Sequence, residues 1–201
     1  MTKQQMLNDL KQECENCKIC EIGKSRTKLV FGSGNPDTAQ VVLIGEAPGE
    51  QEDLQGVPFV GKAGQFMDEY LEKACIDRKK DLYIINTLKC RPFVIKNPQK
   101  GVKSNRPPKR KEKQACEAFM LKQIEIIDPK LIILCGNNAL KSLCGSKYTI
   151  TKVHGRLANL EYNGRKAVAI YHPSYLISYA HSEDKNNEFL EDLKYIKSLI
   201  L

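Results

Sequence analysis

Carboxylates cluster where this sequence leaves its first apolar run, at residues 40–44. The segment "GEAPGEQED" that follows contains Glu46, Glu50, Glu52 and Asp53. Carboxylates at the end of a buried strand can position or deprotonate a water molecule, or stabilise a positive charge that develops on a substrate. A solvated acidic loop is the simpler alternative.

A second group of reactive residues is formed by cysteines, of which the chain has 8. Cys14, Cys17 and Cys20 are separated by two residues each, whereas Cys90 and Cys116 lie far downstream. A C-x2-C pair with two distant cysteines can make a four-thiolate site for zinc or for a [4Fe–4S] cluster. The spacing leaves both open, with free thiols as a third possibility. The other cysteines lie in apolar settings and are predicted to be small buried side chains: Cys75, Cys135 and Cys144.

The chain length and composition are those of one globular domain. It has 201 residues, of which 41% are hydrophobic and 28% are charged. The N-terminal segment predicts a polar helix without an apolar signal core, and no apolar run approaches the length of a membrane span. We therefore expect a cytoplasmic protein that does not partner a membrane.

Positive charge is concentrated in one segment. The net charge is +8, and residues 89–113 hold ten Lys or Arg against the single acid Glu112. Four prolines and few apolar residues predict a basic loop at about 93–111. Such a loop suits a polyanion, most simply a nucleic acid backbone, although a solvated loop is equally compatible with the charge.

The elements that must position these residues alternate along the chain. Short apolar runs rich in Val and Ile predict strands at 40–44, 82–86, 131–135 and 167–171. Amphipathic patterns predict helices around 66–74, 116–127 and 189–200. We expect an α/β fold, a three-layer α/β/α sandwich with a central, mainly parallel four-stranded sheet.

Polar segments follow the predicted strands: "GEAPGEQED", "TLKCRP", "GNNAL" and "HPSYL". In open parallel sheets, ligands bind in the crevice at the carboxyl ends of the strands. These segments are therefore expected to converge in space, although they lie far apart in the sequence.

Three motifs now resemble one family. The segments "GEAPGEQEDLQGVPFVGKAG" (45–64), "NTLKCRP" (86–92) and "HPSYL" (172–176), with the cysteine pattern, closely resemble the family 4, iron–sulfur uracil-DNA glycosylases. The resemblance runs from about Cys17 to the C-terminus. It implies a monofunctional DNA repair hydrolase that releases uracil and leaves an abasic site, built as a single uracil-DNA glycosylase-like domain over 1–201, monomeric, with uracil-containing DNA as its partner.

The same resemblance implies a [4Fe–4S] cluster held by Cys17, Cys20, Cys90 and Cys116. Alignment through "SRT" at 25–27 leaves Cys14 as an extra cysteine.

An enzyme of this kind must hold an extruded base and ease its departure. Uracil-binding residues would be Phe59, Asn86, Gly45 and Ala47, with the Phe59 ring as a stacking platform and the Asn86 amide as the reader of the base edge. Catalytic residues would be His172, Glu46 and Glu52. His172 would donate to O2 of the departing base, and the two carboxylates would favour positive charge at the sugar or position water.

Other residues are expected to contact the DNA backbone or the gap left by the base: Ser174, Tyr175, Lys89, Arg91, Arg106, Lys109 and Arg110. His154 and His181 lack comparable settings and are predicted to be surface residues.

Two alternatives stay open. The segment between Cys90 and Cys116 is longer than expected for the family, as in relatives that trap the abasic product covalently, but it contains no histidine. Because of this long insertion, a uracil-DNA-binding relative with poor turnover or covalent trapping is one alternative, although the histidine that such relatives use is missing. The other is a nucleotide-binding α/β protein with zinc at the cysteines, for which the phosphate-binding pattern G-x-x-x-x-G-K-[ST] is missing.

Overall fold

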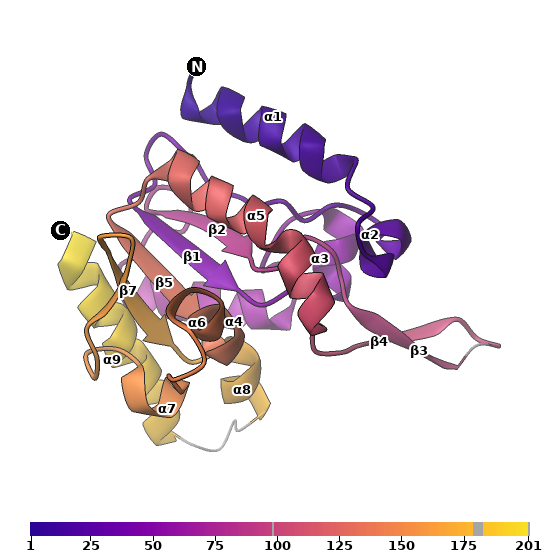
Figure 1. Cartoon of the computed structure of the whole chain (residues 1–201). Coiled ribbons are helices and arrows are strands. Elements are labelled where there is room, and N and C mark those ends of the chain that lie inside the picture. Colours follow the sequence, from indigo (N-terminus) through magenta and orange to yellow (C-terminus); the bar gives the residue numbers. More distant parts are fainter. Residues whose placement is uncertain (98, 179–182, 201) are drawn as a thin grey trace.

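A five-stranded sheet forms the middle layer of the protein (Figure 1). The computed structural model describes residues 1–97, 99–178 and 183–200. The strand order is β2 (Leu82–Asn86), β1 (Val41–Gly45), β5 (Leu131–Cys135), β7 (Arg165–Ile170) and β6 (Leu160–Tyr162). The first four are parallel, and they are the four strands that the apolar runs predict. The predicted α/β class with a mainly parallel sheet is confirmed.

The fifth strand, β6, was missed because it is only three residues long. It pairs antiparallel with β7 through a tight turn at Asn163 and Gly164, both of which have positive φ angles (48° and 76°). An Asn-Gly pair between two strands is the usual signature of such a turn, so the sequence did contain the signal.

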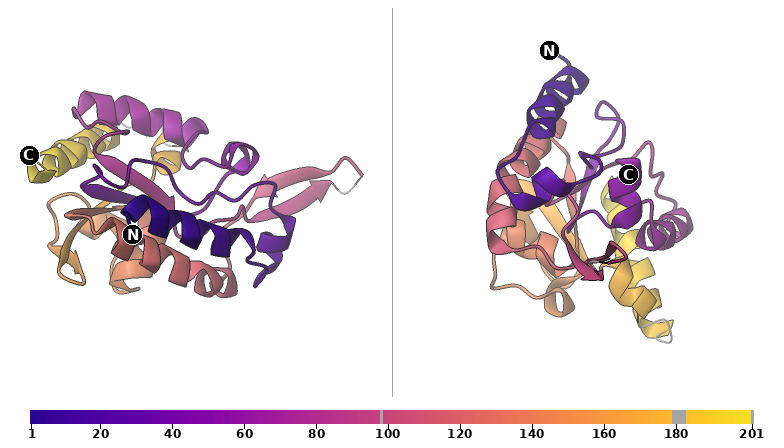
Figure 2. Two further views of the ribbon diagram at one scale, coloured as in Figure 1. Left: turned by 90° about the horizontal axis from the view of Figure 1, so that it is seen from above. Right: turned by 90° about the vertical axis from the view of Figure 1, so that its right-hand side faces the viewer.

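Helices cover both faces of the sheet (Figure 2). On one face lie α4 (Lys62–Lys73), α8 (Pro173–Ser178) and α9 (Glu183–Ile200). On the other lie α5 (Arg110–Ile127) and α6 (Gly136–Cys144), and α1 (Lys3–Glu15) packs on α5. Short helices lie in the connections: α2 (Glu21–Ser25), α3 (Glu50–Gln55) and α7 (Ile150–Val153). No helix in the described ranges combines the length and hydropathy that a bilayer span needs.

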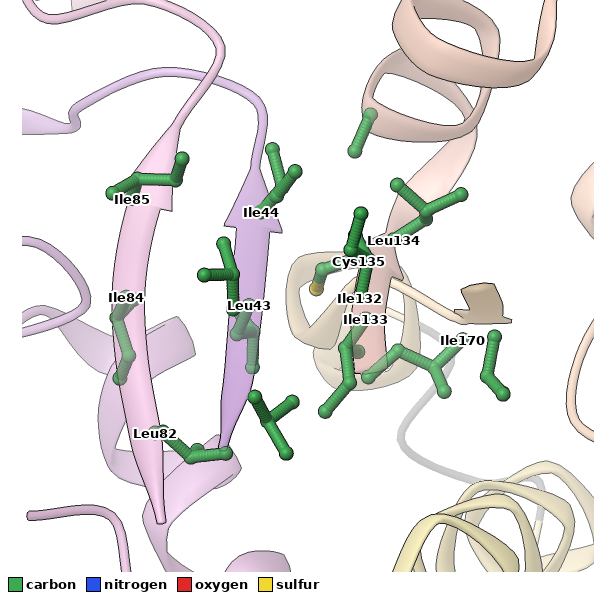
Figure 3. Close-up of a cluster of buried hydrophobic side chains, with 14 of the residues drawn as sticks. Leu43, Ile44, Leu82, Ile84, Ile85, Ile132, Ile133, Leu134, Cys135 and Ile170 are labelled. Atoms are coloured by element: carbon green, nitrogen blue, oxygen red, sulfur yellow. The ribbon is translucent and has the colours of Figure 1, made fainter. Parts of the chain in front are cut away.

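The core is made by the sheet strands, which are apolar on both faces. Figure 3 shows side chains from β1, β2, β5 and β7 packed together, among them Leu43, Ile84 and Ile133. Each is at most 1% exposed. Burial of such a side chain stabilises the folded state by roughly 1.5–3 kcal/mol. Since helices cover both faces, the strands carry continuous apolar runs, without the polar alternation of a one-sided sheet.

The expectation of a loop at about 93–111 was wrong for part of that segment. Residues there form an antiparallel hairpin of β3 (Phe93–Asn97) and β4 (Val102–Asn105), with Phe93 opposite Asn105 and Ile95 opposite Lys103. A register irregularity interrupts the pairing between Ile95 and Asn97. A hairpin satisfies its backbone groups by local pairing and needs no buried face, so a polar composition does not prevent it.

Candidate functional site

A cavity opens at the carboxyl ends of β1, β2 and β7. Its volume is about 560 Å³, within the range of small-molecule sites (roughly 300–1,000 Å³). The predicted site residues that line it are Glu46, Ala47, Glu52, Phe59, Asn86, Arg106, His172 and Ser174. The structure thus brings together, in one cavity, residues from segments that lie more than a hundred positions apart.

Strand register places the amide of Asn86 beside Phe59. Gly45 is the direct partner of Asn86 at the ends of β1 and β2. A Cβ on Gly45 would lie 2.3 Å from Asn86 Oδ1 and 2.7 Å from Phe59 Cε2, so only glycine lets the amide and the ring approach this strand. Asn86 is 3% exposed, and its position is therefore fixed by packing.

The backbone of Phe59 is held in an unusual conformation. Its φ angle is 53°, in the left-handed region that costs a non-glycine residue about 1–2 kcal/mol. The surrounding loop makes room for it, since a Cβ on Gly64 would lie 2.0 Å from Phe59 O. The strain and the glycine together aim the Phe59 ring at the cavity, with its centroid 6.0 Å from that of His172.

His172 lies just beyond β7, where α8 begins. Its Nδ1 accepts a hydrogen bond of 3.2 Å from the backbone N–H of Ser174. The proton of the neutral ring must therefore be on Nε2, which makes Nε2–H a hydrogen-bond donor. Burial lowers the pKa of His172 to about 4, with a smaller opposing effect of Glu52, so the ring is neutral at pH 7.

Gly136 at the end of β5 is a site residue that sequence reasoning missed. Its φ angle is 87°, and a Cβ there would lie 2.9 Å from His172 Cβ. The segment "GNNAL" was identified as a strand exit, but its glycine was given no role. The packing of that glycine against His172 can be seen only once β5 and β7 are known to be neighbours.

The two candidate carboxylates occupy different environments. Glu52 accepts hydrogen bonds from the backbone N–H groups of Gly49 (3.0 Å), Val60 (3.1 Å) and Gly61 (2.9 Å). Its carboxylate therefore fastens the loop that carries Phe59. The half-buried Glu46 lines the cavity, and its carboxylate makes no hydrogen bond or ion pair with other described residues. Glu46 is thus the carboxylate available to a ligand.

A second, small cavity is lined by five cysteines: Cys14, Cys17, Cys20, Cys90 and Cys116. They come from the end of α1, the approach to α2, the exit of β2 and the first turns of α5. Burial raises the pKa of Cys14 to about 12 and that of Cys90 to about 11, so both are thiols unless a metal replaces the proton.

Cations and N–H groups surround these sulfurs. Arg26 Nη1 lies 3.5 Å from Cys90 Sγ, and the backbone N–H of Lys89 donates to Cys116 Sγ at 3.3 Å. Such groups stabilise thiolate ligands. Within the described residues, no three His, Cys, Asp or Glu side chains are grouped as ligands of a single metal ion would be. Five thiols around one small cavity include enough donors for the four thiolates that a [4Fe–4S] cluster would take.

Comparison with known proteins identifies the family. The family model described as "Uracil DNA glycosylase superfamily" matches residues 31–194. The type-4 uracil-DNA glycosylase of Thermotoga maritima is 38% identical over 99% of this chain and 97% of its own. Those of Archaeoglobus fulgidus and Sulfurisphaera tokodaii are 35% and 32% identical, over 96% and 97% of this chain and 92% and 85% of theirs. This chain belongs to the type-4 uracil-DNA glycosylases.

Three of the cations expected to contact DNA are engaged within this type-4 glycosylase. Lys89 is 0% exposed, and its Nζ donates to the backbone oxygen of Asn86 at 2.7 Å. The buried Arg91 binds Asn105 Oδ1 (2.7 Å) and Glu50 (3.1 Å). Arg106 lines the cavity, but its guanidinium pairs with both oxygens of Glu112. Burial places Lys89 and Arg91 out of reach of a phosphate, so that part of the expectation was wrong, and Glu112, six positions downstream, occupies the guanidinium of Arg106.

The remaining DNA-contact candidates of the type-4 glycosylase are exposed. Lys109 and Arg110 lie at the start of α5, and Ser174 lies at the rim of the cavity. Tyr175 is 39% exposed and stacks on Tyr171 with ring centroids 5.5 Å apart.

Two minor predictions were wrong. His154 is not a surface residue, because its Nδ1 lies 2.8 Å from Asp192 Oδ2 and its side chain is largely covered; His181 lies outside the described residues. Among the cysteines predicted to be buried, Cys75 is exposed and Cys144 is half-buried, whereas Cys135 is fully buried.

We expect His172 of this type-4 glycosylase to stay neutral, with its proton on Nε2, from pH 5 to pH 9. Burial that lowers the pKa to about 4 predicts that the ring gains its second proton only at lower pH. Nitrogen-15 NMR of labelled histidine measures both the tautomer and the titration. A midpoint near the ordinary value of 6.5, or a proton on Nδ1, would contradict this description of the site.

Glu52→Gln is expected to lower the free energy of unfolding by about 1–3 kcal/mol. The two carboxylate oxygens of Glu52 accept hydrogen bonds from three backbone N–H groups, whereas the amide has only one acceptor oxygen. Glu46→Gln is the matched control and should leave stability within about 0.5 kcal/mol of the native value. Urea denaturation followed by circular dichroism measures both. Equal stabilities for the two variants would show that Glu52 does not fasten the loop.

Proposed function

We propose that this protein hydrolyses the N-glycosidic bond between uracil and deoxyribose in DNA, releasing uracil and leaving an abasic site. The observation that carries the proposal is the convergence of Phe59, Asn86 and His172 on one cavity in a member of the type-4 uracil-DNA glycosylases. The protein would act as a monomer inside the cell.

Uracil would enter the cavity as an extruded base. The Phe59 ring offers a stacking face, worth roughly 1–3 kcal/mol per base. The Asn86 amide can accept from N3–H and donate to O4 of uracil, and Gly45 and Ala47 bring the backbone of the first loop close to the base. Cytosine has the opposite pattern at these two positions. An amide that cannot turn therefore rejects it, and the burial of Asn86 against Gly45 restrains that turn.

His172 would stabilise the departing base. As the glycosidic bond breaks, negative charge develops on the uracil ring, chiefly at O2. A neutral Nε2–H donor aimed at that oxygen stabilises the charge where it grows, without a proton transfer. Loss of one such donor typically costs 10²- to 10³-fold in rate.

Glu46 would act on the deoxyribose and the attacking water. The deoxyribose ring acquires positive charge in the transition state, and a nearby carboxylate favours it and can orient the attacking water. Glu52 was an equal candidate from sequence. Its three backbone hydrogen bonds suit it to a positioning role, holding the loop on which both Glu46 and Phe59 depend.

Ser174, Tyr175, Lys109 and Arg110 are proposed to contact the DNA around the extruded nucleotide. All four are exposed, and Ser174 borders the cavity. Hydroxyl groups and cations at such positions bind phosphate oxygens and fix the register of the protein on the strand.

Cys17, Cys20, Cys90 and Cys116 are proposed to hold a [4Fe–4S] cluster, with Cys14 as the fifth thiol at the same cavity. When bound, the cluster would cross-link the N-terminal segment, the exit of β2 and α5. Arg26 and Lys89 offset the negative charge of the thiolates. Cys90 follows β2 by four positions, so this cross-link would also steady the strand end that carries Asn86.

The activity is tested with a labelled oligonucleotide that contains one uracil, beside a matched oligonucleotide with thymine. We expect alkali to cleave only the uracil strand after incubation. His172→Ala should lower single-turnover release by about 10²- to 10³-fold with little loss of DNA binding. His154→Ala, which removes a histidine outside the cavity, is the control. No scission of either strand would refute the proposed activity, and an adduct that survives detergent would indicate covalent trapping instead.

The cluster is tested by composition. We expect the purified protein to contain about four irons and four sulfides per chain and to absorb broadly in the visible range. Cys90→Ser should abolish this absorbance, whereas the exposed Cys75→Ser should leave it unchanged, and Cys14→Ser should retain it if Cys14 is the spare thiol. Stoichiometric zinc in a colourless protein would contradict the assignment.

A further inference from the structure

The β3–β4 hairpin projects away from the body of the protein. Figure 1 and the left view of Figure 2 both show it extending beyond the layers of helices and sheet, free of other elements along its length. A two-stranded hairpin alone is marginally stable in water, so one that stands out from the fold needs either firm anchors or a partner.

Its base is firmly anchored. Arg91 binds Asn105 Oδ1 at 2.7 Å, and Arg106 Nε donates to the backbone oxygen of Phe93 at 3.2 Å. The guanidinium of Arg106 also pairs with Glu112 at the start of α5. Hydrogen bonding to Arg106 lowers the pKa of Glu112, so this pair stays charged at neutral pH. The hairpin therefore has a defined direction.

The base of the hairpin borders the cavity. Pro92, Asn105, Arg106 and Pro107, which flank or end the two strands, line the proposed uracil site. A nucleic acid strand that places a nucleotide in the cavity therefore passes the base of the hairpin.

The outer part of the hairpin exposes apolar side chains. Val94, Ile95 and Val102 are 45%, 56% and 47% exposed. Strand register puts Val94 opposite Ser104, so Val94 and Val102 share one face of the ribbon, whereas Ile95 lies with Lys103 on the other. Val94 and Val102 therefore form an exposed β-branched pair on one face of a projecting element, which is available to a partner that buries it.

The charge around these side chains identifies the partner. Lys96, Lys100 and Lys103 are exposed, and residues 93–111 contain no Asp or Glu. Recognition of an apolar protein surface does not require three lysines, whereas lysines bind the negative charges of a polyanion. Grooves of duplex DNA offer phosphates at their edges and apolar sugar and methyl groups within, and they admit a two-stranded β-ribbon.

We propose that the β3–β4 hairpin lies in a groove of duplex DNA next to the extruded nucleotide, with Lys96 and Lys100 on phosphates and Val94 and Val102 against the groove wall. The hairpin then favours double-stranded over single-stranded substrate. This inference rests on the proposed function, which places uracil-containing DNA at the adjacent cavity.

The charge contribution is tested by the double variant Lys96→Gln, Lys100→Gln. Binding to a labelled duplex with one U·G pair is followed by fluorescence anisotropy over a range of KCl concentrations. The slope of log K against log [KCl] should fall in magnitude by about 1.8, or about 0.9 for each phosphate contact. The matched control is Lys79→Gln, Lys80→Gln, two exposed lysines just before the amino end of β2, whereas the hairpin follows its carboxyl end. A slope equal to that of the control would overturn the proposal.

The apolar contribution is tested by Val94→Thr, Val102→Thr, which keeps both strands β-branched. Duplex affinity should fall about tenfold with the salt slope unchanged, because two methyl groups leave an apolar contact. The exposed Leu157→Thr is the control. An unchanged affinity, or an equal loss with the single strand, would overturn docking in a duplex groove.

Uracil release from single-stranded DNA and binding to duplex DNA distinguish a wrong role for the hairpin from a wrong activity for the protein. With the uracil strand alone, the hairpin variants should release uracil within about twofold of the native rate, because the cavity is intact. If the native protein releases no uracil from either substrate, the activity is wrong, whereas the anisotropy experiments still report on the hairpin because they measure binding only.

Discussion

The pairing of Gly45 with Asn86 at the carboxyl ends of β1 and β2 fixes how the amide and the Phe59 ring approach the cavity. Because Gly45 has no side chain, the Asn86 amide and the Phe59 ring can both lie against β1. The same sheet places β5 between β1 and β7, so Gly136 lies under His172 and sets its position. A stacking face, an amide and a neutral imidazole thus meet because parallel strands end at one edge of a sheet.

Lys89 joins the two cavities of the molecule. Its ammonium group, which no solvent reaches, donates to the backbone oxygen of Asn86, and its backbone N–H donates to Cys116 Sγ. Burial lowers the pKa of Lys89 to about 8, and the neighbouring sulfurs oppose that shift. The ordering of the cysteine site and the position of the amide that would read uracil are therefore parts of one packed unit. From the sequence, Lys89 was expected to contact DNA at the surface, because charge alone does not reveal burial.

Much of the fold and the centre of the site could be predicted from the sequence. Continuous apolar runs identify strands covered on both faces, and the polar exits of those strands predicted that Phe59, Asn86 and His172 would converge. Other features depend on contacts that only the folded chain reveals. Arg106 is a loop cation until Glu112 is placed beside it, and no local pattern distinguishes the anchored Glu52 from Glu46, whose carboxylate has no partner among the described residues.

The proposed mechanism requires that groups from the connections after three strands hold one extruded pyrimidine. A crystal structure of the protein with duplex DNA containing 2′-fluoro-deoxyuridine, which resists cleavage, tests it most directly. We expect uracil to stack on Phe59, with its N3–H and O4 at the Asn86 amide and its O2 at His172 Nε2. A uracil that stays in the helix, or binds with O2 directed away from His172, would contradict the proposed mechanism.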